Sequence, residues 1–231
     1  MNSDLINSSE GATNICSLIG EDATYIENYK FKDDESLVDI VIPSNIKFIG
    51  CGAFMACKNL ESVFIESGTE KIMADAFRDC PKLRIVVMYE GVVGIGHRAF
   101  MNDASLQILK LPDGVTDLDI ELCMNCEKLS DFHFPASARR VRDDAFNGCR
   151  SLENIDLPEG MNAVCDNAFA HCTGIKSIHI PSSIYRIMKT AFWKSNSNAK
   201  VTLSENNHDF KLVDGCLVDN LDGTILIGNT K

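Results

Sequence analysis

Cysteine is the residue type that could support the widest range of chemistry in this chain, which contains ten cysteines among 231 residues. Cys123 and Cys126 form a C-x-x-C pair, a spacing used by zinc sites and by thioredoxin-like redox pairs. The sequence has no second C-x-x-C that could complete a zinc site, and no βαβ pattern surrounds the pair. We therefore expect neither a metal nor any other cofactor here.

Motifs for other catalytic chemistry are also missing from the sequence. G-x-S-x-G, H-E-x-x-H, G-x-G-x-x-G and the Walker-type G-x-x-x-x-G-K do not occur. The glycine-rich stretch from Gly91 to Gly96, with His97 beside it, lacks the strand–loop–helix context of a phosphate-binding loop. These absences favour a noncatalytic protein.

A repeat of 23 residues explains most of the cysteines and phenylalanines. Ala-Phe recurs in this register at Ala53-Phe54, Ala76-Phe77, Ala99-Phe100, Ala145-Phe146, Ala168-Phe169 and Ala191-Phe192. Cys123 takes the Phe position of the remaining unit. Three residues after each Phe position lie Cys57, Cys80, Asp103, Cys126, Cys149, Cys172 and Ser195. Extending the register back to Phe31 predicts about eight units.

Each unit also carries an apolar–x–apolar pair, from Ile40/Ile42 in the first to Val201/Leu203 in the last, and this alternation predicts a strand. Proline follows directly in five units, where its missing N–H ends strand pairing: Pro43, Pro112, Pro135, Pro158 and Pro181. The Ala-Phe segment leaves room for only a turn or two of helix. Because one coil cannot bury its apolar side alone, we expect stacked coils with parallel strands over residues 25–204.

The two ends of the chain lack the repeat. Residues 1–24 are expected to form an N-terminal cap or a partly disordered segment, and Ile15, Leu18 and Ile19 favour a partial cap. Residues 205–231 are expected to form a C-terminal β-hairpin cap, because Asp214-Gly215 and Asp222-Gly223 favour tight turns.

The unit at Leu152–Cys172 shows the repeat most completely, with Leu152, Ile155, Leu157, Pro158, Met161, Val164, Ala168, Phe169 and Cys172 in its defining positions. This pattern resembles the BspA-like class of leucine-rich repeats over about residues 26–203. The resemblance implies an α/β, right-handed leucine-rich-repeat solenoid, strand-rich with short helical turns. It also implies a bacterial surface or interaction protein, with roles in adhesion or host interaction.

The repeat register places most of the cysteines at positions that point into the core. Cys57, Cys80, Cys126, Cys149 and Cys172 share one inward position, where a thiol behaves as a small apolar group, and Cys123 occupies the Phe position. Neighbouring Cα atoms about 5 Å apart permit a disulfide, but side chains in a parallel ladder do not converge as a disulfide requires. Cys16, Cys51, Cys165 and Cys216 lie outside this column, and the redox state stays open.

Two columns of residues are expected to face outward from the predicted strands. The partner-binding residues that we predict on this face are Val41, Phe64, Ile85, Val87, Tyr89, Ile108, Lys110, His133, Asp156 and His179. An exposed apolar patch in the N-terminal half would mark an interaction site. Two alternatives remain: strands simply favour such residues, or the first 24 residues cover the patch.

His133, Asp156 and His179 are consecutive members of one outward column. Such a trio could ligate a metal or titrate near neutral pH. A flat sheet face does not exclude water, so an ordinary solvated surface is the favoured interpretation, and we predict no metal site.

The net charge of −11 and the pI of about 4.9 argue against a nucleic-acid partner. Apolar runs are too short for membrane insertion, and the start of the chain lacks a signal peptide. This predicts a cytoplasmic location, or a secreted or cell-surface one if a natural leader has been removed. We expect a scaffold for protein–protein interaction, monomeric or weakly self-associating, with a carbohydrate- or cell-wall-binding module as the alternative.

Overall fold

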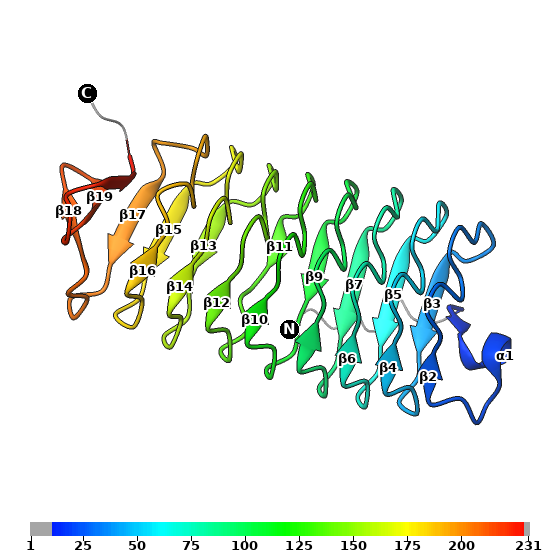
Figure 1. Ribbon diagram of the computed structural model, residues 1–231. Coiled ribbons are helices and arrows are strands. Elements are labelled where there is room, and N and C mark those ends of the chain that lie inside the picture. Colours follow the sequence, from blue (N-terminus) through cyan, green and yellow to red (C-terminus); the bar gives the residue numbers. More distant parts are fainter. Residues whose placement is uncertain (1–10, 229–231) are drawn as a thin grey trace.

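The computed structural model describes residues 11–228, and it confirms a solenoid whose coils repeat every 23 residues. Figure 1 shows the coils stacked in a row, each contributing one strand to each of two neighbouring faces. Strands in successive coils pair in parallel, so that Ile40 lies beside Val63 and Val63 beside Val86. Equivalent residues therefore form columns along the solenoid.

Strands of two to four residues form two parallel sheets in line, which we call the first face. The six-stranded sheet has the order β1 (Thr13–Asn14), β3 (Asp39–Ile42), β5 (Ser62–Ile65), β7 (Ile85–Met88), β9 (Ile108–Lys110) and β11 (Asp131–Phe132). The three-stranded sheet consists of β13 (Asn154–Asp156), β15 (Ser177–Ile180) and β17 (Lys200–Leu203). Strand pairing is interrupted between β11 and β13.

Two-residue strands form a second face. One four-stranded sheet consists of β2 (Tyr25–Ile26), β4 (Phe48–Ile49), β6 (Lys71–Ile72) and β8 (Gly94–Ile95). The other consists of β10 (Asp117–Leu118), β12 (Arg140–Val141), β14 (Ala163–Val164) and β16 (Arg186–Ile187). Here pairing is interrupted between β8 and β10, nearer to the N-terminus than the break on the first face.

Tight turns, not helices, connect the two faces. Among residues 11–228 the single α-helix is α1 (Cys16–Ile19), so the short helical turns that the sequence predicts do not extend into helix. Most coils contain two residues with left-handed backbone, four positions apart, such as Asp75 (φ 58°) and Asp79 (φ 61°). A left-handed residue cannot continue a right-handed helix, which explains why each turn ends at once.

Phenylalanine rings form the central column of the core. Rings of Phe31, Phe54, Phe77 and Phe100 stack with centroids 5.1–5.6 Å apart, and Phe146, Phe169 and Phe192 stack in the same way. Between the two stacks lies Cys123, whose side chain is too small to continue the column.

Phe132, at the end of β11, and Phe134, just after it, pack on the ring stack that begins after Cys123. Phe132 and Phe134 contact each other edge to face at 4.9 Å, and both contact Phe146, at 4.8 and 5.9 Å. The preceding coil has Leu109 and Leu111 at these positions. Larger rings in the strand thus replace the ring that the column lacks.

Both ends of the described solenoid carry additional structure. At the N-terminal end, Ile15 and Cys16 are buried in the core cluster. At the C-terminal end, β18 (Phe210–Val213), β19 (Cys216–Asp219) and β20 (Ile225–Ile227) form an antiparallel sheet, with left-handed Asp214 and Gly215 in its first turn. The part of the predicted N-terminal cap at residues 1–10 lies outside the described residues, as do residues 229–231.

Candidate binding surface

The N-terminal half of the first face brings together the apolar residues predicted there. Strand register places Val41, Phe64, Val87 and Lys110 side by side, and Ile85 beside Ile108. These side chains are half-buried except Phe64, which is only 2% exposed. Phe64 therefore belongs to the floor of this surface more than to its contact layer.

A pocket of about 370 Å³ lies at the end of these strands. Its lining combines the apolar side chains of Val41, Phe64 and Tyr89 with the polar residues Ser44, Glu66 and Ser67. Glu66 is fixed at the rim because its Oε2 accepts a hydrogen bond from the Ser44 N–H at 3.1 Å. This size and mixture of lining groups are typical of a site that receives a ligand or a partner side chain.

The pocket lies where the sequence departs from the repeat. The position that holds proline in five other coils holds Glu66 and Tyr89 in two successive coils. The N–H of Glu66 donates to the Ile42 carbonyl and that of Tyr89 to the Ile65 carbonyl, each at 2.9 Å. Proline could make neither bond, so both substitutions extend the ladder and add side chains to the pocket.

Gly68 closes the turn beside the pocket. Its φ of +127° is accessible to glycine, and a Cβ at this position would lie 2.3 Å from the Ser44 carbonyl oxygen. The close approach holds the turn after β5 against the turn after β3, which carries Ser44. Sequence reasoning found Tyr89 but missed Ser44, Glu66 and Ser67, and the missing prolines were the available signal.

The C-terminal half of the first face is polar. Lys110 forms an ion pair with Asp131, and the His133 Nδ1 lies 3.5 Å from the same carboxylate. Asp156 pairs in register with His179, whose Nδ1 lies 3.1 Å from the Thr202 hydroxyl.

The three residues of the predicted outward trio do not form one cluster. His133 follows β11 and Asp156 lies in β13, and these strands belong to different sheets. Within residues 11–228, no group of three or more His, Cys, Asp or Glu side chains is placed to hold a metal ion.

The cysteine column lies entirely in the core. Its five thiols are 0% exposed, and each Sγ lies 3.0–3.2 Å from the backbone carbonyl oxygen of the residue 26 positions earlier. Burial raises the pKa of Cys172 to about 12, and the pKa of Cys149 is also raised, chiefly by burial. Cys149 and Cys172 therefore stay protonated and are poor nucleophiles, and all five column thiols donate to carbonyls in a core that excludes reagents.

The C-x-x-C cysteines are also part of this core. Cys123 and Cys126 are both 0% exposed free thiols, and the Cys126 Sγ contacts the Phe100 carbonyl. Outside the column, Cys16 is buried, whereas Cys51, Cys165 and Cys216 are half-buried.

A second apolar surface on the second face was missed by sequence reasoning. Tyr25 and Phe48 pair in register on β2 and β4, and they are 56% and 39% exposed. Together with Met73 they line a hollow of about 500 Å³. The signal was the outward residue before each buried residue of the short strands, a column that the sequence interpretation did not follow.

A family model for the BspA type leucine rich repeat region, with six copies, matches residues 13–130 and 120–212. The chain belongs to the BspA-type leucine-rich repeat family. Proteins with this repeat are typically noncatalytic, and membership of the family suggests a scaffold for protein interaction. No helix within residues 11–228 of this BspA-type protein is long and apolar enough to cross a membrane.

Solved structures with similarity to this BspA-type protein come from several bacteria. A leucine rich cell surface protein from Faecalibacterium prausnitzii is 18% identical, with 79% of this chain and 83% of that chain covered and a TM-score of 0.36. A leucine-rich repeat protein from Bacteroides ovatus is 24% identical, with 79% and 59% covered and a TM-score of 0.45. The leucine rich repeat protein of T. pallidum is 21% identical, with 71% and 72% covered and a TM-score of 0.45. The search of curated proteins gave no match.

Proposed function

We propose that this BspA-type protein binds a protein partner through the N-terminal half of its first face, centred on the pocket between Val41 and Tyr89. One observation carries the proposal: two neighbouring coils lack proline at the repeat position that usually holds it, and the residues found there instead, Glu66 and Tyr89, both line the pocket. Half-buried Ile85, Val87 and Ile108 continue the apolar surface beside it. Apolar surface next to a pocket with fixed polar groups is the usual composition of an interaction site.

The charge of the pocket favours a particular kind of partner segment. Among the described residues that line it, the Glu66 carboxylate is the only ionisable side chain besides Tyr89, and the whole chain carries a net charge of −11. A bulky apolar side chain next to a lysine or arginine would complement both features. Adhesion to another cell or a host protein is the setting that we propose for this contact.

The test compares a variant of the surface with a matched variant elsewhere. Val87→Asp places a charge on the first face, and Tyr185→Asp places one on a residue that is 61% exposed beside the second face. Partners captured from host or bacterial lysate by the wild type should be retained by the Tyr185 variant. Their affinity for the Val87 variant should fall by about 30-fold, the loss of a binding hot spot. Equal capture by all three proteins would contradict the proposal.

Carbohydrate binding is a second candidate, and it is supported by the aromatic pair on the second face. Tyr25 and Phe48 present two adjacent exposed rings, whereas the first face exposes only Tyr89 to a comparable degree. A sugar that stacks on aromatic rings would therefore bind at Tyr25. A glycan array compared between the wild type and Tyr25→Ala tests this candidate, which a signal equal for both proteins would contradict.

A further inference from the structure

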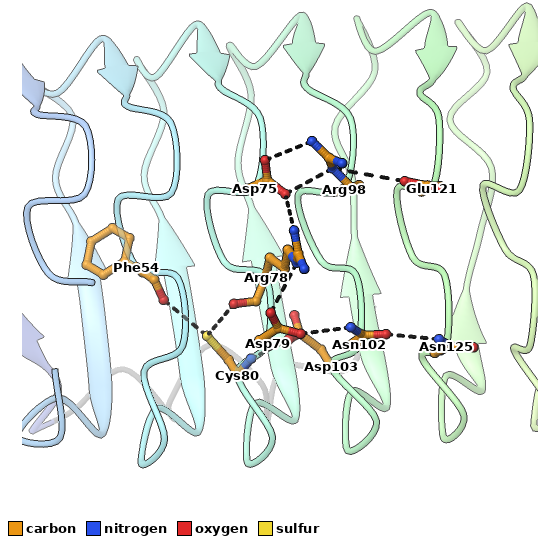
Figure 2. A network of polar contacts seen from close by, with 10 residues as sticks. All are labelled: Phe54, Asp75, Arg78, Asp79, Cys80, Arg98, Asn102, Asp103, Glu121 and Asn125. Atoms are coloured by element: carbon orange, nitrogen blue, oxygen red, sulfur yellow. Dashed lines mark hydrogen bonds and ion pairs between the residues drawn. The ribbon is translucent and has the colours of Figure 1, made fainter. Parts of the chain in front are cut away.

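Asp103 occupies a place in the core that six of the seven repeat units from Cys57 to Ser195 give to cysteine or serine. Its side chain is 0% exposed, and no other acidic or basic residue within residues 11–228 is classed as buried. Figure 2 shows it beside Cys80, and its Oδ1 accepts a hydrogen bond from the Cys80 N–H at 2.7 Å. The second oxygen, Oδ2, is buried and has no hydrogen-bond partner.

In the cysteine column, the side chain at this position donates a hydrogen bond to a backbone carbonyl. In the coils before and after, the thiols of Cys80 and Cys126 lie 3.2 and 3.0 Å from the carbonyl oxygens of Phe54 and Phe100, and each donates its hydrogen. The same offset of 26 residues assigns the Phe77 carbonyl to Asp103. A carboxylate has no hydrogen to donate, whereas a neutral carboxylic acid has one.

Charges around Asp103 do not favour its ionised form. The preceding coil contributes the Asp79 carboxylate, which repels a negative charge on Asp103. The nearby cation, Arg78, pairs through Nε with Asp79 at 3.1 Å (Figure 2). Burial is the main cause that raises the pKa of Asp103 well above its usual value; the Asp79 carboxylate adds to it and the Cys80 N–H opposes it.

The coil that contains Asp103 is also the coil where strand pairing along the second face is interrupted. Strand β8 lies before Asp103 in the sequence and β10 after it, and these two strands are not paired. A few residues later the chain enters β9, which carries Ile108 and Lys110 of the first face. A buried acid and a break in strand pairing therefore coincide at the junction between the apolar and polar halves of that face.

We propose that Asp103 is held as a neutral carboxylic acid that donates a hydrogen bond to the Phe77 carbonyl, and that its ionisation loosens the solenoid at this junction. The group binds its proton more tightly in the folded chain than in the unfolded chain. Its contribution to stability is complete below the unfolded pKa and is lost as the pH rises toward the folded pKa. The solenoid at this junction is thus most stable at low pH and becomes less stable as the pH rises.

Urea unfolding of the full chain at pH 5, 6, 7 and 8 tests the proposal. Asp103→Asn keeps an oxygen for the Cys80 N–H and supplies an N–H for the Phe77 carbonyl, without titrating. The unfolding equilibrium constant of the wild type relative to this variant should rise by up to about tenfold per pH unit, as expected for one linked proton. A ratio that stays constant from pH 5 to pH 8 would overturn the proposal.

Two further measurements keep the test decisive. Asp79→Asn retains Asp103 and removes only a lesser cause of its raised pKa, so the dependence on pH should persist in the same direction. If the asparagine variant does not fold, Asp103→Cys, which restores the column residue, serves in its place as the variant that lacks the dependence on pH. In wild-type protein labelled with carboxyl-¹³C aspartate, the infrared band of a protonated carboxyl should persist at pH 7. Its absence at that pH would overturn the proposal without any variant.

Discussion

Cys123 and Phe132 should be energetically coupled, because the Phe132 ring packs on Phe146 next to the place where the ring column lacks a phenylalanine, at Cys123. Phe132 is 6% exposed and its ring centroid lies 4.8 Å from that of Phe146, the next ring in the interrupted column. Phe132→Leu removes roughly three buried carbons, each worth about 0.8 kcal/mol, so the free energy of unfolding should fall by about 2 kcal/mol. Cys123→Phe alone overpacks a side chain that is 0% exposed and should cost about 1–3 kcal/mol.

Combining both substitutions restores the column residue at 123 and the leucine that the preceding coil has at the equivalent of 132. The two single losses sum to about 3–5 kcal/mol, whereas the double variant should lose only about 1–2 kcal/mol, a coupling of about 2–3 kcal/mol. Urea unfolding followed by circular dichroism and by the fluorescence of Trp193, the one tryptophan, measures the free energy of unfolding. Agreement of the two probes is required, because repeat arrays can unfold in parts.

Cys123→Phe combined with Ile178→Val serves as the control, because Ile178 lies two coils further along and its effect should add. A double variant of Cys123 and Phe132 that loses the full sum would refute the compensation between these two positions.

Three other predictions concern particular residues of the turns, the thiols and the C-terminal sheet. Gly68→Ala should destabilise the protein by more than 2 kcal/mol, because its Cβ would meet the Ser44 carbonyl, whereas Gly215→Ala has open space and should cost only about 1 kcal/mol; thermal unfolding compares them. A thiol reagent added to the native protein should modify Cys51, Cys165 or Cys216 and leave the buried column unmodified until urea is added, as mass spectrometry of the peptides would show. The pKa of Asp222 is lowered to about 2, chiefly by hydrogen bonds from Thr224 and to a lesser degree by Lys189. Measured by NMR, the pKa of Asp222 should therefore lie nearer to its usual range in Thr224→Val than in Lys189→Ala.

The periodic part of the structure could be predicted from the sequence. A fixed period forces equivalent side chains into columns, so the burial of Phe54 or Cys57 follows from position alone. For the same reason the neighbours of Val41 and Phe64 on the first face were predictable.

Departures from the repeat were the part that the sequence could not resolve. The pocket depends on Glu66 and Tyr89 in the place of proline, and its depth depends on turns whose geometry leaves no periodic signal. Left-handed backbone occurs at residues as different as Ala56, Arg98 and Lys194, because the stacked coils impose the turn on the residue. The breaks between β8 and β10 and between β11 and β13 arise from packing across coils, which residue types in one unit do not report.

The most direct test of the proposed function is site-specific photo-crosslinking from the first face. A photoreactive amino acid at position 87 lies beside the pocket, and the same amino acid at position 185 lies outside the first face. The proposed function predicts a discrete crosslinked protein from position 87 that disappears when Glu66→Lys reverses the charge at the rim, and none from position 185. Crosslinks to the same protein from position 185 alone, with none from position 87, would show that the partner binds elsewhere.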